Sequence, residues 1–287
     1  VYKRQGVRID VMTEKQVHGA VLEHNRKAAA MWSQGGRAYD AISSGISEGI
    51  RHGVARLAPA ADQDVLDIAT GTGWTARQVA KLGAKVTAVD IADGLLSAAR
   101  ALAADEGVTV EWRLGDAEKL PLADASFDAA ISTFGIMFAS NQEAALGELS
   151  RVVRPGGRIA VVAWEPNTNA AALRQVVAPF MPQAPAPKTP PPSPFNWGDP
   201  DWLFSALGDH FDLRHEKGEL FHRLSSPSEA WTVYSSGFPP VQAVAGALAP
   251  ARREEMRLAF EEWVGTYRTD LGVAIPFQYL VTIGIKR

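Results

Sequence analysis

The chain has 287 residues, of which 46% are hydrophobic and 21% charged, so it can bury a core without support from a metal or a disulfide. This composition excludes a disordered, collagen-like or coiled-coil protein. The net charge of −3 leaves no basic field for nucleic acid or an anionic membrane. The absence of cysteine excludes disulfides and thiolate metal sites, and no apolar run approaches the roughly 20 residues of a membrane span. We therefore expect a cytoplasmic protein.

Two helices are expected before the first strand. The apolar spacing predicts them over about 14–31 and 37–57, and Ile42, Ile46 and Ile50 follow one another at intervals of four in the second. Residues 1–11 show no clear period. We expect them to be a leader or an appended segment outside the fold.

From Asp64 onward, short apolar strands alternate with helices. Strands are predicted over 65–69, 86–89, 108–112, 127–132 and 158–163, with helices near 74–82, 93–104 and 141–153. This alternation predicts an α/β fold, with a doubly wound and mostly parallel sheet covered on both faces. The run Arg154-Pro155-Gly156-Gly157 is predicted to be the turn from the last helix into its strand.

A proline-rich stretch follows the fifth strand. Nine of the 18 prolines lie between Pro179 and Pro200, which predicts a stiff, extended excursion rather than helix or inner strand. It is interpreted either as a spacer or as a lid over a pocket. Beyond it, helices are predicted near 199–207, 227–235 and 251–269, and strands near 211–217 and 277–285.

A glycine-rich turn joins the first strand to its helix. Gly71 and Gly73 let the backbone turn sharply and approach a ligand, and the helix that follows offers free N–H groups and positive potential. The run from Gly71 to Ala76 also satisfies the dinucleotide-binding fingerprint. Asp90, at the end of the next strand, suits the hydroxyls of a ribose in either case.

Asp67 distinguishes a dinucleotide from a ligand that carries an amino group. It lies inside the first strand, four residues before the first glycine. A second negative charge beside a pyrophosphate is repulsive, whereas beside the ammonium group of an amino-acid-like ligand it is favourable. Asp116, after the third strand, is a further acid, suited to an adenine amino group. Each acid alone is typical of a turn or a helix cap, but all three fall where open α/β sheets bind ligands.

At this point the sequence resembles the class I S-adenosylmethionine-dependent methyltransferases, especially the branch similar to the ubiquinone and menaquinone biosynthesis enzymes. The resemblance covers roughly residues 60–165. It is carried by the segments Val65–Thr75, Val86–Ile91, Gly115–Leu122, Ser126–Ser132 and Glu148–Arg158. It implies S-adenosylmethionine as cofactor and S-adenosylhomocysteine as product. It also implies a Rossmann-like sheet of seven strands, in which the strand over 277–285 inserts antiparallel between the fifth strand and the one near 211–217.

The resemblance also implies roles for particular residues. Asp67, Gly71 and Gly73 would hold the methionine end, Asp90 the ribose, and Asp116 with Ala117 the adenine. Ala69 replaces a glycine that the family often has, and Tyr39 is the candidate for an aromatic residue that closes on the cofactor, although it could equally anchor its helix to the core. With Ile91 and Ser132 added, the residues expected to bind the cofactor are Tyr39, Asp67, Ala69, Gly71, Gly73, Asp90, Ile91, Asp116, Ala117 and Ser132.

The implied organisation is a single methyltransferase domain over 12–287. We expect a helical cap at 12–58, a cofactor-binding core at 59–165, a substrate-side insertion with a strand and helices at 166–274, and the final strand at 275–287.

The acceptor is expected to be a small, aromatic or apolar molecule. The fourth strand runs into Phe134 without the Asn/Asp-Pro-Pro-aromatic turn usual in nucleobase methyltransferases, and there is no Arg/Lys stripe, so no nucleic-acid partner is expected. Phe134, Met137, Trp164 and Trp197 are candidates for an aromatic-lined acceptor pocket, although each could instead be core. No metal is expected, and the oligomeric state is left open.

Methyl transfer from a sulfonium is an in-line displacement, so positioning in a dry site can supply most of the acceleration. A base is needed only for an acceptor such as a hydroxyl. Weak candidates for this base are His52, Glu165, His215 and His222. Two alternatives stay open: a nicotinamide-dependent oxidoreductase, which leaves Asp67 unexplained, and a non-catalytic regulatory protein that binds S-adenosylmethionine.

Overall fold

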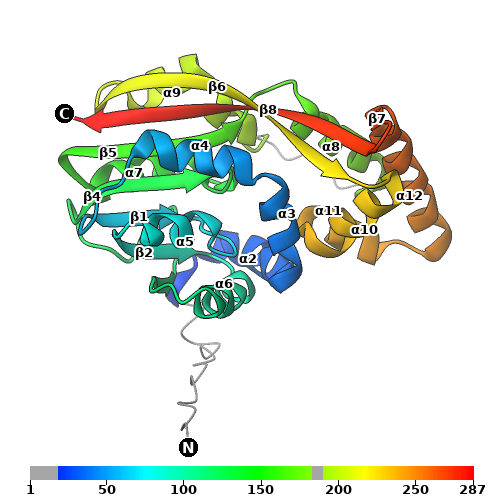
Figure 1. Cartoon of the computed structure of the whole chain (residues 1–287), viewed down its shortest axis with the longest axis horizontal. Helices are drawn as coiled ribbons and strands as arrows, with labels where there is room; N and C mark the ends of the chain where they lie inside the picture. The colour runs from blue at the N-terminus through cyan, green and yellow to red at the C-terminus, as the bar shows by residue number, and fades with distance from the viewer. Residues whose placement is uncertain (1–18, 183–189) are drawn as a thin grey trace, which may run out of the picture.

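The computed structural model describes residues 19–182 and 190–287 and shows a twisted central sheet between layers of helices (Figure 1). The order along the sheet is β3-β2-β1-β4-β5-β8-β6, and a two-residue strand, β7, pairs with β8. The strands are β1 (Asp64–Ile68), β2 (Lys85–Asp90), β3 (Glu111–Leu114), β4 (Phe127–Thr133), β5 (Val153–Trp164), β6 (Phe211–Leu224), β7 (Arg268–Thr269) and β8 (Gly272–Lys286). The strands β1 to β5 are parallel to one another, and β8 is antiparallel to both β5 and β6. The predicted fold class and the inserted antiparallel strand are therefore confirmed.

Helices cover both faces of the sheet. They are η1 (Glu23–Asn25), α2 (Arg26–Ser33), η2 (Gly36–Ala38), α3 (Tyr39–Gly45), α4 (Ser47–Leu57), α5 (Trp74–Lys81), α6 (Asp93–Asp105), η3 (Ile136–Phe138), α7 (Gln142–Val152), α8 (Asn169–Val177), η4 (Ala178–Phe180), η5 (Pro194–Gly198), α9 (Pro200–Leu207), α10 (Pro227–Gly237), α11 (Pro239–Ala247) and α12 (Pro250–Gly265). No helix within the two described ranges is both long and apolar enough to cross a bilayer.

Alternate residues of each inner strand point to opposite faces. In β1, Val65 packs with α4 and α5, whereas Leu66 and Ile68 pack with α7 and α9. Both sets are fully or almost fully buried. This burial on both faces explains why the inner strands are continuous apolar runs in the sequence.

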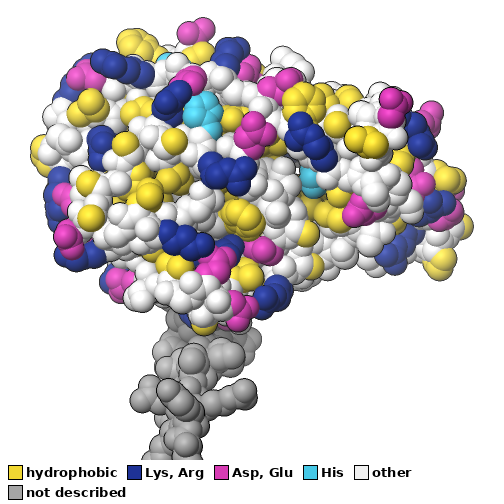
Figure 2. Space-filling view, in the orientation of Figure 1, with side chains coloured by type: hydrophobic (Ala, Val, Ile, Leu, Met, Phe, Trp, Pro, Cys, Tyr) yellow, Lys and Arg dark blue, Asp and Glu magenta, His cyan; other side chains and the backbone are white. Residues whose placement is uncertain are grey.

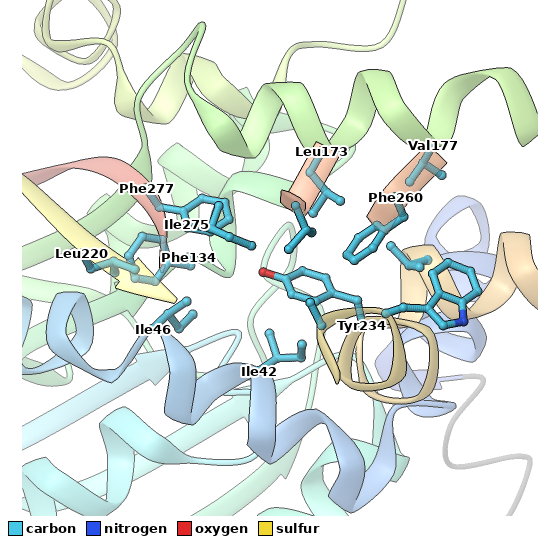
Figure 3. Close-up of a cluster of buried hydrophobic side chains, with 14 of the residues drawn as sticks. Ile42, Ile46, Phe134, Leu173, Val177, Leu220, Tyr234, Phe260, Ile275 and Phe277 are labelled. Atoms are coloured by element: carbon cyan, nitrogen blue, oxygen red, sulfur yellow. The ribbon is translucent and has the colours of Figure 1, made fainter. Parts of the chain in front are cut away.

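A third apolar cluster lies where β6 and β8 run past the parallel strands. The first half of β8 pairs with β6 but not with β5, and α3, α8, α10 and α12 contribute side chains around it. Figure 3 shows Tyr234 of α10 at the centre of this cluster, with Ile42 on one side and Leu173 and Phe260 on the other. Phe134, which follows β4, belongs to the same cluster.

The N-terminal helices differ from the prediction. The helix predicted over 14–31 is described only from residue 19, and its regular part begins at Arg26, because the backbone of Leu22 is extended. The helix predicted over 37–57 is divided at Ile46, where φ is −107° and ψ is 9°. Periodicity alone could not locate these breaks, since the apolar residues keep the same spacing across them.

Several strand boundaries were also wrong. The third strand was predicted over 108–112 but begins at Glu111, where its pairing with β2 starts. The turn predicted at 154–157 lies inside β5, which begins at Val153. Strands β6 and β8 are longer than predicted because they pair with each other from Phe211 to Leu224. The helix predicted over 251–269 ends at Gly265 and is followed by β7.

Two helices were missed, α8 and α11. In α11, Pro239 and Pro240 resemble helix breakers in the sequence, but they occupy the first turn, where a proline needs no N–H partner. The proline-rich stretch includes residues 183–189, which lie outside the described residues. The described remainder forms η4, η5 and the start of α9. The leader interpretation of residues 1–11 also falls outside the described range.

Candidate functional site

The turn after β1 is held in a left-handed backbone conformation at three positions. The φ angles are 56° at Ala69, 58° at Gly71 and 81° at Gly73. Glycine adopts this conformation without strain, whereas alanine does so at a cost. Ala69 is accommodated because Gly135 lies opposite: a Cβ added at Gly135 would be 2.6 Å from the Cβ of Ala69.

Asp90 anchors this turn from the neighbouring strand. Its Oδ2 accepts a hydrogen bond from the N–H of Gly71, and its Oδ1 accepts one from the N–H of Ala92, both at 2.8 Å. Burial raises the pKa of Asp90 to about 6, against the lowering effect of these N–H groups. A carboxylate has about four lone-pair sites, so Asp90 keeps acceptor capacity for a ligand.

Asp67 lies behind the turn, with 1% of its surface exposed. Its Oδ2 accepts a hydrogen bond from the Thr70 hydroxyl at 2.5 Å, and its Oδ1 has no hydrogen-bond partner. Burial raises the pKa of Asp67 to about 7. An ionised carboxylate with an unsatisfied oxygen is costly when it is buried, so burial favours the protonated form of Asp67 in the free protein.

Asp116 is held by the N-terminal segment. Its Oδ2 accepts from the side-chain amide of Asn25 at 2.9 Å and from the N–H of Leu22 at 3.2 Å, and its Oδ1 accepts from the N–H of Glu118 at 3.0 Å. The oxygen of the Asn25 amide accepts from the Ser140 hydroxyl at 2.7 Å. The segment before α2 therefore crosses the carboxyl end of β3 and shares the acid that was expected to face only a ligand.

A cleft of about 720 Å³, part of it open to solvent, lies over the carboxyl ends of β1, β2 and β4. The predicted residues that line the cleft are Tyr39, Ala69, Gly71, Asp90, Ile91, Asp116, Ala117 and Phe134. Sequence reasoning missed Asn25, Ala28 and Trp32, which line it from the N-terminal helices.

Aromatic side chains line one part of the cleft. Trp32, Tyr39, Phe134 and Phe138 all belong to its wall. The ring of Trp32 lies 5.2 Å from that of Phe138 and 6.0 Å from those of Tyr39 and Phe238. These rings come from α2, α3, η3, the residue after β4 and the residue before α11. These residues are far apart in the sequence and meet only in the folded protein.

Three predicted cofactor residues do not line the cleft: Asp67, Gly73 and Ser132. A Cβ at Gly73 would meet the ring of Trp112 at 2.5 Å, so this glycine permits close packing. The Ser132 hydroxyl donates to the carbonyl of Ile68 at 2.8 Å and accepts from the N–H of Ile136 at 3.0 Å. Both residues therefore shape the site from behind its wall.

The predicted acceptor residues divide into three groups. Phe134 lines the cleft, and Trp164 stacks on it from outside, with 3.9 Å between ring centroids. Met137 and Trp197 are buried on the opposite face of the sheet, with α7 and α9, at 1% and 0% exposed. Their expected place in an acceptor pocket stays a prediction, because apolar character in the sequence does not distinguish core from cavity.

The four candidate bases are absent from the described wall of the cleft. His52 contacts the Tyr279 hydroxyl through Nδ1 at 3.1 Å, and His215 contacts the Thr282 hydroxyl at 3.0 Å. Glu165 pairs with Lys217 at 2.9 Å. The structure gives each of these three side chains a partner elsewhere in the fold.

His222 is buried, and its Nδ1 lies 3.0 Å from the hydroxyl of Tyr234, which belongs to the cluster of Figure 3. Burial lowers the pKa of His222 to about 4, so the imidazole is neutral near pH 7 and serves as the polar partner of Tyr234. Across the described parts of the chain, no group of three His, Cys, Asp or Glu side chains is arranged to hold a metal ion.

The comparisons with known proteins agree with this geometry. Residues 66–161 match the family described as a methyltransferase domain. The uncharacterized protein Rv1403c of Mycobacterium tuberculosis is 36% identical over 178 residues, which are 61% of this chain and 64% of that protein. The demethylmenaquinone methyltransferase of Mycobacterium bovis is 36% identical over 152 residues, 50% of this chain and 62% of that enzyme. The match thus spans less than two thirds of either relative.

The fold has solved counterparts as well. The YcgJ protein of Bacillus subtilis superposes with a TM-score of 0.59 and 21% identity, over 84% of this chain and 99% of that one. The family match, the relatives and the topology coincide over the segment that holds the glycine turn, Asp90 and Asp116. Over residues 66–161, the chain therefore contains a segment that matches a methyltransferase domain.

Proposed function

We propose that this protein transfers the methyl group of S-adenosylmethionine to an oxygen, nitrogen or carbon atom of a small aromatic or apolar acceptor. The observation that carries the proposal is the wall of one cleft, which combines Asp90 and Asp116 with four aromatic rings. The acids suit the polar nucleoside. The rings of Trp32, Tyr39, Phe134 and Phe138 suit a flat apolar partner beside it.

The residues present fit the cofactor. The backbone lines the cleft at Gly71, where an added Cβ would lie 3.2 Å from the Tyr39 ring. In this proposal Asp90 would accept hydrogen bonds from the ribose hydroxyls, and Asp116 with Ala117 would bind the adenine. The unpaired oxygen of buried Asp67 favours a ligand that carries an ammonium group over a diphosphate, because opposite charges attract strongly at low dielectric.

The chain's own contribution to such a reaction is positioning and the exclusion of water. S-adenosylmethionine supplies an electrophilic methyl group. The aromatic rings would hold the acceptor atom in line with it and keep the site dry, which can account for most of the acceleration. Since no His or Lys lines the described cleft, we propose that an acceptor needing a base passes its proton to water.

A small-molecule acceptor fits the surface charge better than a nucleic acid does. On the face shown in Figure 2, Lys and Arg side chains are interspersed with Asp and Glu rather than gathered in a stripe. The net charge of the chain is −3. Binding to nucleic acid depends on neutralising phosphates with clustered basic residues, and this pattern supports the proposed class of acceptor.

We expect Asp90→Ala to weaken the binding of S-adenosylhomocysteine by about 1–3 kcal/mol, the scale of a lost hydrogen bond to a charged group. The variant also loses the acceptor for the Gly71 N–H. Isothermal titration calorimetry measures the change, with the exposed Asp105→Ala variant as the control. An unchanged dissociation constant in a folded Asp90→Ala protein would remove Asp90 from the site.

Acceptor specificity tests the proposed activity. Phenols, quinols, amines and aliphatic carboxylates are incubated with S-adenosylmethionine carrying a labelled methyl group, and the methylated products are counted. We expect phenols or quinols to be methylated best, and Trp32→Ala to lower kcat/KM for them at least tenfold, because this ring forms part of the proposed acceptor wall. Turnover of carboxylates alone would contradict the proposed acceptor class. Tight cofactor binding without any product would favour a regulatory protein.

A further inference from the structure

Asp40 connects the N-terminal helices to the glycine turn. It follows Tyr39 at the start of α3. Its Oδ1 accepts a hydrogen bond from the Thr72 hydroxyl at 3.0 Å and another from the indole N–H of Trp74 at 2.8 Å. Thr72 and Trp74 flank Gly73, so a single carboxylate oxygen holds both sides of the turn.

A buried cation joins the same oxygen. The Nη2 atom of Arg77 lies 3.2 Å from Asp40 Oδ1, and its Nε donates to the carbonyl of Gly73 at 3.2 Å. Arg77 is only 4% exposed, and its guanidinium also pairs with Glu106. A buried charge requires such partners. Asp40 therefore holds the side chains on both sides of the turn, and Arg77 holds the backbone of the turn.

Tyr39 extends this connection into the cleft. Its ring lines the cleft and lies against Gly71. Because Tyr39 and Asp40 are consecutive, the hydrogen bonds of Asp40 fix the backbone that carries the Tyr39 ring. Thr72 also lies 3.4 Å from the Ser43 hydroxyl, one turn further along α3. The first turn of α3 and the glycine turn are thus one connected unit.

We propose that Asp40 is a positioning residue for cofactor binding: it holds the glycine turn and the Tyr39 ring in the arrangement that receives the cofactor. This inference rests on the proposed function, in which the cleft binds S-adenosylmethionine. Asp40 itself is absent from the described wall of the cleft, so it acts through Thr72, Trp74 and Tyr39. The N-terminal helices are then part of the cofactor site rather than only its cover.

Two substitutions distinguish the positioning role of Asp40 from the effect of its negative charge. Asp40→Ala removes the hydrogen bonds that Asp40 accepts from Thr72 and Trp74. Asp40→Asn keeps an Oδ1 acceptor for both but removes the negative charge beside Arg77. We expect Asp40→Ala to weaken S-adenosylhomocysteine binding at least tenfold by calorimetry, and Asp40→Asn to stay within threefold of the unchanged protein. In turnover assays the KM for S-adenosylmethionine should rise in Asp40→Ala, with kcat at saturation changed less than twofold.

A spectroscopic measurement reports on the hydrogen bond itself. The indole N–H signal of Trp74, assigned with Trp74→Phe in ¹H–¹⁵N spectra, should move upfield in Asp40→Ala and keep its position in Asp40→Asn. Arg37→Ala is the matched control, because Arg37 belongs to the preceding turn and pairs only with exposed Asp105 at 3.0 Å among the described contacts. It should leave both the affinity and the Trp74 signal unchanged.

The outcomes are distinct. If the unchanged protein does not bind S-adenosylhomocysteine, the proposed function fails. If it binds, and folded Asp40→Ala binds within twofold of it, the positioning role is overturned. Equal losses in Asp40→Ala and Asp40→Asn would assign the effect to the lost negative charge beside Arg77 rather than to the hydrogen bonds, and would also overturn the positioning role. A lower unfolding temperature with unchanged affinity would show a purely structural role and contradict the inference.

Discussion

Replacing Gly71 with valine should abolish measurable binding of S-adenosylhomocysteine, a loss of more than about 100-fold or roughly 3 kcal/mol. Gly71 has φ of 58°, a left-handed conformation that a β-branched residue adopts only with strain. The new Cβ would lie 3.2 Å from the Tyr39 ring, inside the cleft. A shift of the turn would also disturb the hydrogen bond from the Gly71 N–H to Asp90. Calorimetry, with circular dichroism to verify folding, measures the effect.

Gly107→Val provides the matched control. Gly107 has φ of 66°, and an added Cβ meets nothing within 4 Å. It follows α6, at the amino-terminal side of β3 and away from the cleft. The two variants therefore share the strain of the backbone and differ in their relation to the cleft. We expect similar losses of thermal stability but normal affinity in Gly107→Val. Normal affinity in folded Gly71→Val would contradict the assignment of the cleft to the cofactor.

The cofactor-binding core could be predicted because the sequence patterns that indicate it are local. The turn at Gly71 and the acid at Asp90 each end a continuous apolar strand, and parallel strands bring their carboxyl ends to one edge of the sheet. The order of the strands follows from this alternation and from the resemblance to a known family. The structure confirms both the parallel arrangement and the inserted β8.

The remaining parts of the site depend on contacts between distant segments. Asn25 reaches Asp116 across 91 residues of sequence, and Trp32 meets Phe238 across 206 positions, the difference of their residue numbers. Helical periodicity shows which face of a helix is apolar but not which strand end it crosses. The role of Trp197 stays a prediction for the same reason, because a buried tryptophan in the core and one in a cavity wall have the same pattern in the sequence.

A second large effect is expected at Asp67, on the stability of the fold. The pKa of Asp67 decides whether stability rises or falls with pH. Burial raises the pKa of Asp67 to about 7 in the folded protein, whereas an aspartate in an unfolded chain titrates near pH 4 (roughly 3.9). The folded state therefore binds the proton more tightly. The stability that protonated Asp67 contributes is fully present below about pH 4 and is lost as the pH rises through about 7. The pKa of Asp90, raised by burial to about 6, acts in the same direction.

Asp67→Asn should therefore stabilise the ligand-free protein at pH 8, by on the order of 2–3 kcal/mol, and change it much less at pH 5. The amide cannot ionise, so it avoids the cost of a buried charge with an unpaired oxygen. Urea unfolding at both pH values measures this difference. Asp62→Asn is the control, because the side chain of Asp62 is 90% exposed and the variant therefore makes the same chemical change outside the core.

The same substitution should weaken the binding of S-adenosylhomocysteine at pH 8 at least tenfold, because the ammonium group of the ligand loses the buried charge that attracts it. For the unchanged protein, affinity should rise between pH 6 and pH 8 as Asp67 ionises. Stability and affinity then move in opposite directions at one residue, as expected where a charge is retained for a ligand. A gain in stability at pH 8 without any loss of affinity would show that Asp67 does not act on the cofactor, and a site selective for diphosphates would become the better interpretation of the turn.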